Sequence, residues 1–128
     1  MGLDIYFFEL QKNTTTPVSE LTEQPIDVGY FRKVNALLNW INTHVEPVQN
    51  CVDIDITRSH LQRLYDNLTQ LTPKNCGEQF PTTEGFFFGS TEYDHSYWQD
   101  VNDVKIWVHD MLETFDFDES RLVFHAWW

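Results

Sequence analysis

Residues 2–10 have the sequence GLDIYFFEL and show the two-residue period of a β-strand. Leu3, Ile5 and Phe7 fall on one face, and the β-branched and aromatic content of the stretch favours extended structure. Residues 121–128, RLVFHAWW, alternate in the same way. The sequence therefore predicts a strand at each end of the chain.

Three segments between these strands have the 3.6-residue period of amphipathic helices. The first begins at Tyr30 and ends before Pro47, and its apolar residues are Phe31, Val34, Leu38, Ile41 and Val45. The second follows Thr57, the expected N-cap residue. The third is longer and is expected to be capped by Ser90 or Thr91. Its apolar stripe consists of Tyr97, Val101, Val104, Val108, Met111 and Phe115.

The remaining segments are short strands and loops. Residues 51–57, CVDIDIT, alternate and predict a strand, and residues 85–88, GFFF, predict an extended run with Phe86 and Phe88 on one face. Residues 11–28 are polar and rich in Thr and Pro, which is typical of a long irregular loop. We therefore expect one α+β domain over residues 1–128, with three main helices packed on a small sheet that includes the N- and C-terminal strands.

The composition is that of a folded chain of 128 residues, with 41% hydrophobic and 16% aromatic residues. No apolar run approaches the roughly 18–20 residues that span a bilayer, and the N-terminus lacks the basic and then apolar order of a signal peptide. We expect a cytoplasmic protein without a membrane segment. Cys51 and Cys76 lack the CxxC spacing and are expected to be free thiols.

The chain is strongly acidic, with a net charge of −12 from 20 acidic and 8 basic residues. Between Glu92 and Ser120 the only basic residue is Lys105. Such a charge repels nucleic acid phosphates, so we expect no direct nucleic acid binding, whereas a basic protein would be attracted. The candidate interaction residues, which lie away from the apolar stripe of the third helix, are Asp100, Asp103, Asp110 and Glu113. Solubility is the simpler explanation of the same acidity.

Few patterns indicate metal, cofactor or catalytic chemistry. The phosphate-loop and dinucleotide fingerprints, GxSxG and HExxH are absent, so we expect no cofactor and no metal. His95 and His109 would lie about 21 Å apart along one helix, too far to share an ion. Asp53 and Asp55 could bind a hard cation weakly from one strand face, but a solvated strand face is the simpler explanation, and we favour it.

Two groups of residues suggest binding surfaces. In YFRKVN, residues 30–35, the side chains of Tyr30, Arg32, Lys33 and Asn35 could hold a phosphate or carboxylate, or the two bases could neutralise acids such as Asp4 or Asp94. Trp127 and Trp128 would be costly to expose at a chain end. They predict either an interface, including one between copies of this chain, or a seal over the core.

Three segments together carry a resemblance: MGLDIYF (1–7), GYFRKVNALLNWI (29–41) and GFFFGSTEYDHSYWQDV (85–101). In this order and spacing they resemble a family of small uncharacterised proteins encoded by phages and prophages. The polar motif residues of that family correspond to Asp4, Tyr6, Tyr30, Arg32, Lys33, Asn35, Ser90, Thr91, Tyr93 and Asp94. The resemblance implies a mobile-element protein that acts in a bacterial cytoplasm, and implies no reaction.

Two functional hypotheses follow. The first is a non-enzymatic acidic interaction protein that modulates a basic host protein, with mimicry of nucleic acid as one form of it. The second is a small-molecule or anion site, or a small enzyme. In that site Arg32 and Lys33 would bind an anion, Asp94 would act as a base, and Tyr30 and Tyr93 would shape the pocket.

Overall fold

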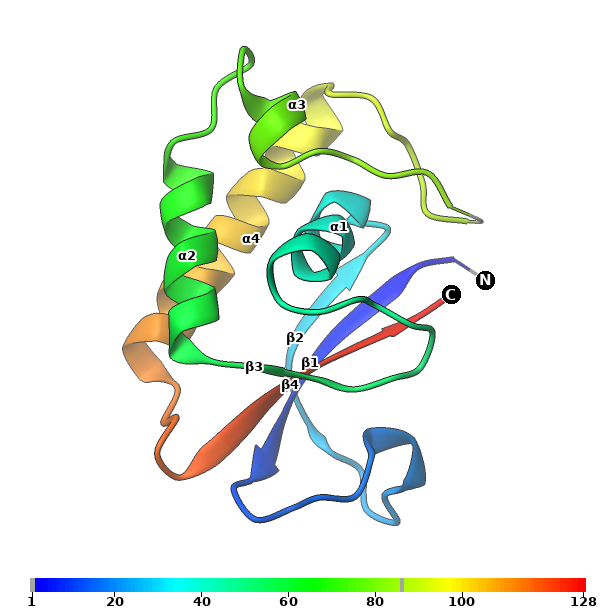
Figure 1. Ribbon diagram of the computed structural model, residues 1–128, viewed down its shortest axis with the longest axis vertical. Helices are drawn as coiled ribbons and strands as arrows, with labels where there is room; N and C mark the ends of the chain where they lie inside the picture. The colour runs from blue at the N-terminus through cyan, green and yellow to red at the C-terminus, as the bar shows by residue number, and fades with distance from the viewer. Residues whose placement is uncertain (1, 86) are drawn as a thin grey trace.

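Strands β1 (Asp4–Gln11) and β4 (Ser120–Trp127) pair antiparallel along their whole length at the centre of a four-stranded sheet. The computed structural model, which describes residues 2–85 and 87–128, shows these strands side by side in Figure 1. Strand β2 (Ile26–Arg32) pairs with the other side of β1, and β3 (Ile54–Ile56) with the other side of β4. All three pairings are antiparallel, in the order β2-β1-β4-β3.

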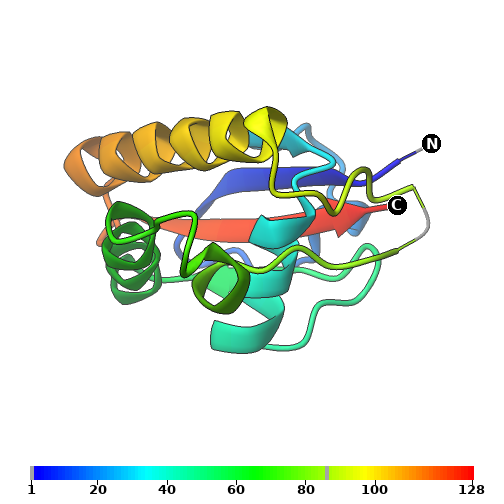
Figure 2. The ribbon, with the colours of Figure 1, turned by 90° about the horizontal axis from the view of Figure 1, so that it is seen from above.

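The helices cover one face of this sheet. They are α1 (Asn35–His44), α2 (Arg58–Thr69), the short α3 (Cys76–Gln79) and α4 (His95–Thr114). Figure 1 shows them on one side and the segment after β1, with its 3-10 turn η1 (Val18–Glu20), on the other, and in Figure 2 the helices lie in front of the strands. Leu3, Ile5 and Phe7 are fully buried beneath the helices. The predicted α+β class, with the terminal strands in the sheet and three main helices on it, is confirmed.

Two of the helical predictions are confirmed in detail. The predicted stripe of the long helix is buried, with Val104 and Val108 wholly inaccessible to solvent. Thr57 caps α2: its hydroxyl accepts a hydrogen bond from the backbone N–H of His60 at 3.2 Å, and the Nδ1 atom of His60 accepts one from the backbone N–H of Thr57 at 3.0 Å. This reciprocal pair satisfies two donors at the helix start. No helix of the described residues is long and apolar enough to cross a membrane.

The predicted start of the first helix at Tyr30 is wrong. Tyr30 belongs to β2 and pairs with Tyr6 of β1, and the helix begins at Asn35. The chain changes direction at Lys33, which has a positive φ of 58° and donates its backbone N–H to Leu3 O at 2.7 Å. Strand pairing therefore overrides the helical apolar period of this segment, and residues 26–28 of the predicted loop also join the strand.

The predicted extended run GFFF is also wrong for the residues that the structure describes. Phe87 has a positive φ of 63°, and the backbone N–H of Phe88 donates to Gly85 O at 3.1 Å, so the segment turns. The predicted position of Phe86 lies outside the described residues. Phe88 is nevertheless buried and contributes to the core.

Helix α4 covers part of the exposed edge of the sheet. The indole N–H of Trp107 donates to Val28 O of the edge strand β2 at 2.8 Å, and the backbone N–H of Gly29 donates to its neighbour Asp27 at 3.0 Å. A side chain at Gly29 would collide with the indole, since a Cβ atom there would lie 2.6 Å from Trp107 Nε1. Two edge groups that another strand could pair with are therefore already bonded.

We predict that Gly29→Ala destabilises the protein by about 1–3 kcal/mol, because the added methyl group displaces Trp107 from the edge. Urea denaturation followed by tryptophan fluorescence measures this change. Gly77→Ala is the matched control, because its Cβ would only reach ordinary contact distance, 3.8 Å from the Tyr93 hydroxyl. Equal stability of the two variants would contradict the proposed contact.

Candidate functional site

The start of α4 and the turn before α1 enclose a cavity of about 190 Å³, which we call the α4 cavity. It brings together two of the three motif segments, residues 32–36 and 89–100. Four of the predicted ligand-binding residues line it: Arg32, Lys33, Asn35 and Asp94. Tyr30 and Tyr93 are not among the lining residues. The fold therefore brings together most of the predicted ligand-binding residues, although most of them also bond to other residues of the protein.

Arg32 forms an ion pair with Asp4 of the adjacent strand β1. Its Nη1 atom lies 2.8 Å from Asp4 Oδ1, and the hydroxyl of Tyr30 donates to the same oxygen at 2.6 Å. This hydrogen bond, together with burial, raises the pKa of Tyr30. The sequence allowed Arg32 either to bind an anionic ligand or to neutralise an acid of the protein. The structure shows it neutralising Asp4.

Asn35 holds two loop segments against the start of α1. Its side chain is buried, and its amide donates to Phe88 O at 3.1 Å and to Ser90 O at 3.0 Å. Its amide oxygen accepts from the backbone N–H of Thr83 at 3.1 Å. With three hydrogen bonds to the backbone, Asn35 shapes the wall of the cavity, and little of its bonding capacity remains for a ligand.

Asp94 is the N-cap of α4, which corrects the predicted cap at Ser90 or Thr91. Its Oδ1 atom accepts from the backbone N–H of Tyr97 at 3.1 Å. The hydroxyl of Ser90 instead accepts from the backbone N–H of Glu92 within the preceding turn. The second carboxylate oxygen of Asp94 has no hydrogen-bond partner among the described residues, so it remains able to accept one.

Tyr93 and Tyr97 support the loop beside the cavity. The hydroxyl of Tyr93 accepts from the backbone N–H of Thr82 at 3.2 Å, and its ring packs edge-on against that of Tyr97, with the centroids 4.9 Å apart. The hydroxyl of Tyr97 donates to Phe80 O at 2.8 Å, and burial raises the pKa of Tyr97. Both tyrosines therefore fix the loop that precedes α4.

The α4 cavity contains more acidic than basic groups. Asp100, predicted as part of an exposed surface, is half-buried and lines the cavity with Glu92 and Asp94. Burial, and then repulsion from Asp103 and Asp94, raises the pKa of Asp100. Lys33 has no ion-pair partner among the described residues. Since Arg32 is paired with Asp4, one ammonium group faces three carboxylates, and the cavity favours a cation.

The other predicted surface residues are divided between solvent and core. Asp103, Asp110 and Glu113 are exposed on the outer face of α4, and Asp110 and Glu113 flank His109 at 3.8 and 3.4 Å. Trp127 is 56% exposed. The ring of Trp128 packs edge-on against Phe88, with the centroids 5.4 Å apart. Trp128 thus seals the core, and Trp127 is left to solvent.

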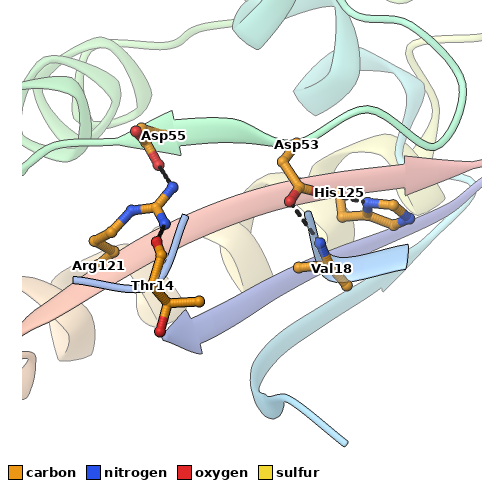
Figure 3. A network of polar contacts seen from close by, with 6 residues as sticks. All are labelled: Thr14, Val18, Asp53, Asp55, Arg121 and His125. Atoms are coloured by element: carbon orange, nitrogen blue, oxygen red, sulfur yellow. Dashed lines mark hydrogen bonds and ion pairs between the residues drawn. The ribbon is translucent and has the colours of Figure 1, made fainter. Parts of the chain in front are cut away.

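Asp53 and Asp55 bind other parts of the chain. Asp53 accepts from the backbone N–H of Val18 at 2.8 Å and lies 2.9 Å from Nδ1 of His125, whereas Asp55 pairs with Arg121 at 2.6 Å (Figure 3). These contacts hold the segment after β1 against the sheet. No group of three or more His, Cys, Asp or Glu side chains in residues 2–85 and 87–128 could hold a metal ion.

We predict that Asn35→Ala destabilises the protein by about 2–4 kcal/mol, because two backbone carbonyls and one N–H lose their partner in a buried site. Asn39→Ala, on the same helix, removes a single bond to Pro81 O and should cost about 1 kcal/mol. Chemical denaturation measures both. Similar losses in the two variants would show that the Asn35 contacts do not hold the loop.

We predict that Asp100→Asn stabilises the protein at pH 7 by about 0.2–0.5 kcal/mol, the usual cost of like charges three residues apart on a helix. Because the pKa of Asp100 is raised on folding, its ionisation opposes folding above the pKa of the unfolded chain. The gain should therefore shrink as the pH falls through the raised pKa of the folded state and disappear well below about 3.9, the pKa of the unfolded chain, where Asp100 is protonated in both states. Thermal unfolding from pH 3 to 8 tests this, with the exposed Glu46→Gln as control. A destabilised variant at pH 7 would contradict it.

Comparison of the chain with protein-family models, curated proteins and solved structures finds no match. The resemblance to phage and prophage proteins therefore stays a prediction, and the functional argument rests on the geometry of the α4 cavity and its surroundings.

Proposed function

We propose that the protein is a non-enzymatic interaction protein that binds a basic protein, and that a lysine or arginine side chain of this partner enters the α4 cavity. The observation that carries the proposal is the charge of the cavity, where the acids Glu92, Asp94 and Asp100 meet the two bases Arg32 and Lys33, and Arg32 is already paired with Asp4. The exposed acids Asp103, Asp110 and Glu113 extend this charge along the outer face of α4.

Electrostatics and size support a cationic side chain as the occupant. Burial is the main cause of the raised pKa of Asp100, and repulsion from Asp103 and Asp94 adds to it; a bound cation would relieve this repulsion. Because Asp100 is half-buried, the attraction is screened less by water than at an open surface. A cavity of about 190 Å³ has room for about six water molecules, which is enough for the end of one long side chain.

Two observations support a basic host protein as the partner: the acidity of the chain and its resemblance to phage and prophage proteins. A net charge of −12 steers basic surfaces toward the protein and repels phosphates. Mimicry of nucleic acid by the acids of α4 would be one form of this interaction. The phage-like sequence motifs support a partner in a bacterial host and action in its cytoplasm.

A lysine-rich peptide is the probe that tests the proposal, with binding to the full chain measured by isothermal titration calorimetry. Binding should weaken steeply with added salt. Asp94→Asn should weaken it about two- to fivefold without unfolding α4, because asparagine also serves as an N-cap. Glu46→Gln removes an exposed acid outside the cavity and α4 and should weaken binding less. Salt-insensitive binding, or equal losses in the two variants, would contradict the proposal.

The second candidate is a site for a small zwitterion, and the meeting of Arg32, Lys33, Asn35 and Asp94 at one cavity favours it. The carboxylate of such a ligand would bind Lys33, and its amine would bind Asp94 or Asp100. A purely anionic ligand fits less well, because Arg32 is paired with Asp4 and Asn35 with the backbone. Thermal stabilisation by free amino acids, in the absence of peptide binding, would favour this candidate over the first.

A further inference from the structure

A second cavity, of about 330 Å³, contains three of the eight basic residues of the chain. We call it the basic cavity, and its charged and hydroxyl-bearing lining residues are Lys12, Asp55, Thr57, Arg58, Ser120 and Arg121. Lys12 follows β1, Arg58 is the first residue of α2, and Arg121 lies in β4. The folded chain thus gathers three cations from distant segments, although its net charge is −12.

The three bases are oriented mainly by uncharged oxygen atoms. Lys12 donates to Phe117 O at 2.6 Å, and Arg58 donates to Leu112 O at 3.1 Å. Arg121 donates to Thr14 O and forms the ion pair with Asp55 that Figure 3 shows. Carbonyl oxygens fix the direction of a cation but carry no net charge, so they leave its charge uncompensated.

The charges of the basic cavity do not balance. Among the described residues that line it, Asp55 is the one carboxylate, so three cations face one anion. On the neighbouring turn, Asp116 accepts from the backbone N–H groups of Asp118 and Glu119, and none of these three acids forms an ion pair with the bases in the described part of the chain. Water screens part of the repulsion among these cations, and a further anion would relieve the rest.

Donors remain available for such an anion. An ammonium group has three N–H bonds and a guanidinium group has five. Lys12 uses one of them, Arg58 one and Arg121 two in the contacts of the described residues. Most of the N–H bonds therefore remain for a ligand, in two planar forks and one ammonium group, an arrangement that matches the oxygen atoms of a phosphoryl group.

We propose that the basic cavity binds the phosphoryl group of a small organic phosphate monoester. The cavity is larger than a phosphate ion requires, and the apolar side chains of Ile56, Phe117 and Leu122 line its remaining wall. The guanidinium carbon of Arg58 already lies 5.0 Å from the ring centre of Phe117, which holds the cation beside this apolar surface. The phosphoryl group of such a ligand would bind the three cations, and its carbon skeleton would pack on the apolar wall.

This site is separate from the α4 cavity. The basic cavity lies by the last turn of α4, where Arg58 binds Leu112, and the α4 cavity lies by the first turn. Over the 20 residues of α4 the two ends are about 30 Å apart. The proposal therefore stands or fails independently of the proposed function, and substitutions in one cavity leave the other intact.

The test uses the full chain, with inorganic phosphate, ribose 5-phosphate and ribose as ligands, in calorimetry and thermal unfolding at low ionic strength. We expect ribose 5-phosphate to bind more tightly than inorganic phosphate and to raise the unfolding temperature, and ribose not to bind. Arg58→Gln and Lys12→Gln should each weaken binding about tenfold, the effect of losing one charge-assisted hydrogen bond. Arg63→Gln, which removes an exposed charge from the same helix, should change it less than twofold.

Each other outcome counts against the proposal. Absence of binding by both phosphates would overturn it. Equal affinity for inorganic phosphate and ribose 5-phosphate would show that the apolar wall does not contact the organic part of the ligand. This result would overturn the proposal of an organic phosphate. If Arg63→Gln weakened binding equally, the phosphate would be attracted by the overall charge of the protein and not by the basic cavity. Lys12 is exposed and lies just after β1, so Lys12→Gln keeps the test decisive if Arg58→Gln fails to fold.

Discussion

The antiparallel ladder between β1 and β4 is the constraint on which the rest of the structure depends. It joins the two ends of the chain at the centre of the sheet, and both edge strands attach to it. Phe7 and Phe124 are partners in this ladder, are fully buried, and have their ring centres 5.6 Å apart. The buried face that this pairing creates is the surface on which the helices pack. Both cavities depend on the ladder as well, because Arg32 joins its Asp4 and Arg121 belongs to β4.

The opposite charges of the two cavities follow the dipole of α4. Acids gather at its N-terminal end, where Asp94 caps the helix, and Arg58 donates to a carbonyl of its last turn. Both arrangements stabilise the helix, because its N-terminus carries partial positive and its C-terminus partial negative charge. The dipole explains the sign of each group of charges. The dipole does not explain why the charges of each group outnumber the opposite charges in the same cavity. This excess of charge supports the two binding proposals.

The sequence predicts the parts of the fold that a single period determines. The stripe of α4, the terminal strands and the cap at Thr57 are visible in it, because burial on one face and the requirements of an N-cap are local. The strand around Tyr30 is not visible, since its pairing with β1 overrides a helical period. The cap at Asp94 was missed because Ser90, Thr91 and Asp94 all have suitable side chains, and only the tertiary path of the loop determines which one meets the first turn. Lys12, Arg58 and Arg121 are distant in sequence, so their cavity has no sequence pattern.

The hydrogen bond from Trp107 to Val28 O fixes helix α4 to the edge strand β2. The outer face of α4 carries the exposed acids, while its inner face covers an edge of the sheet. A partner that tilted or lifted this helix would uncover strand β2 and make it available for pairing with another chain. If the protein binds a partner as proposed, binding on the outer face would keep this edge covered only if α4 stays in place. The outer face of α4 would then act as a rigid surface, and any rearrangement on binding would occur in the partner.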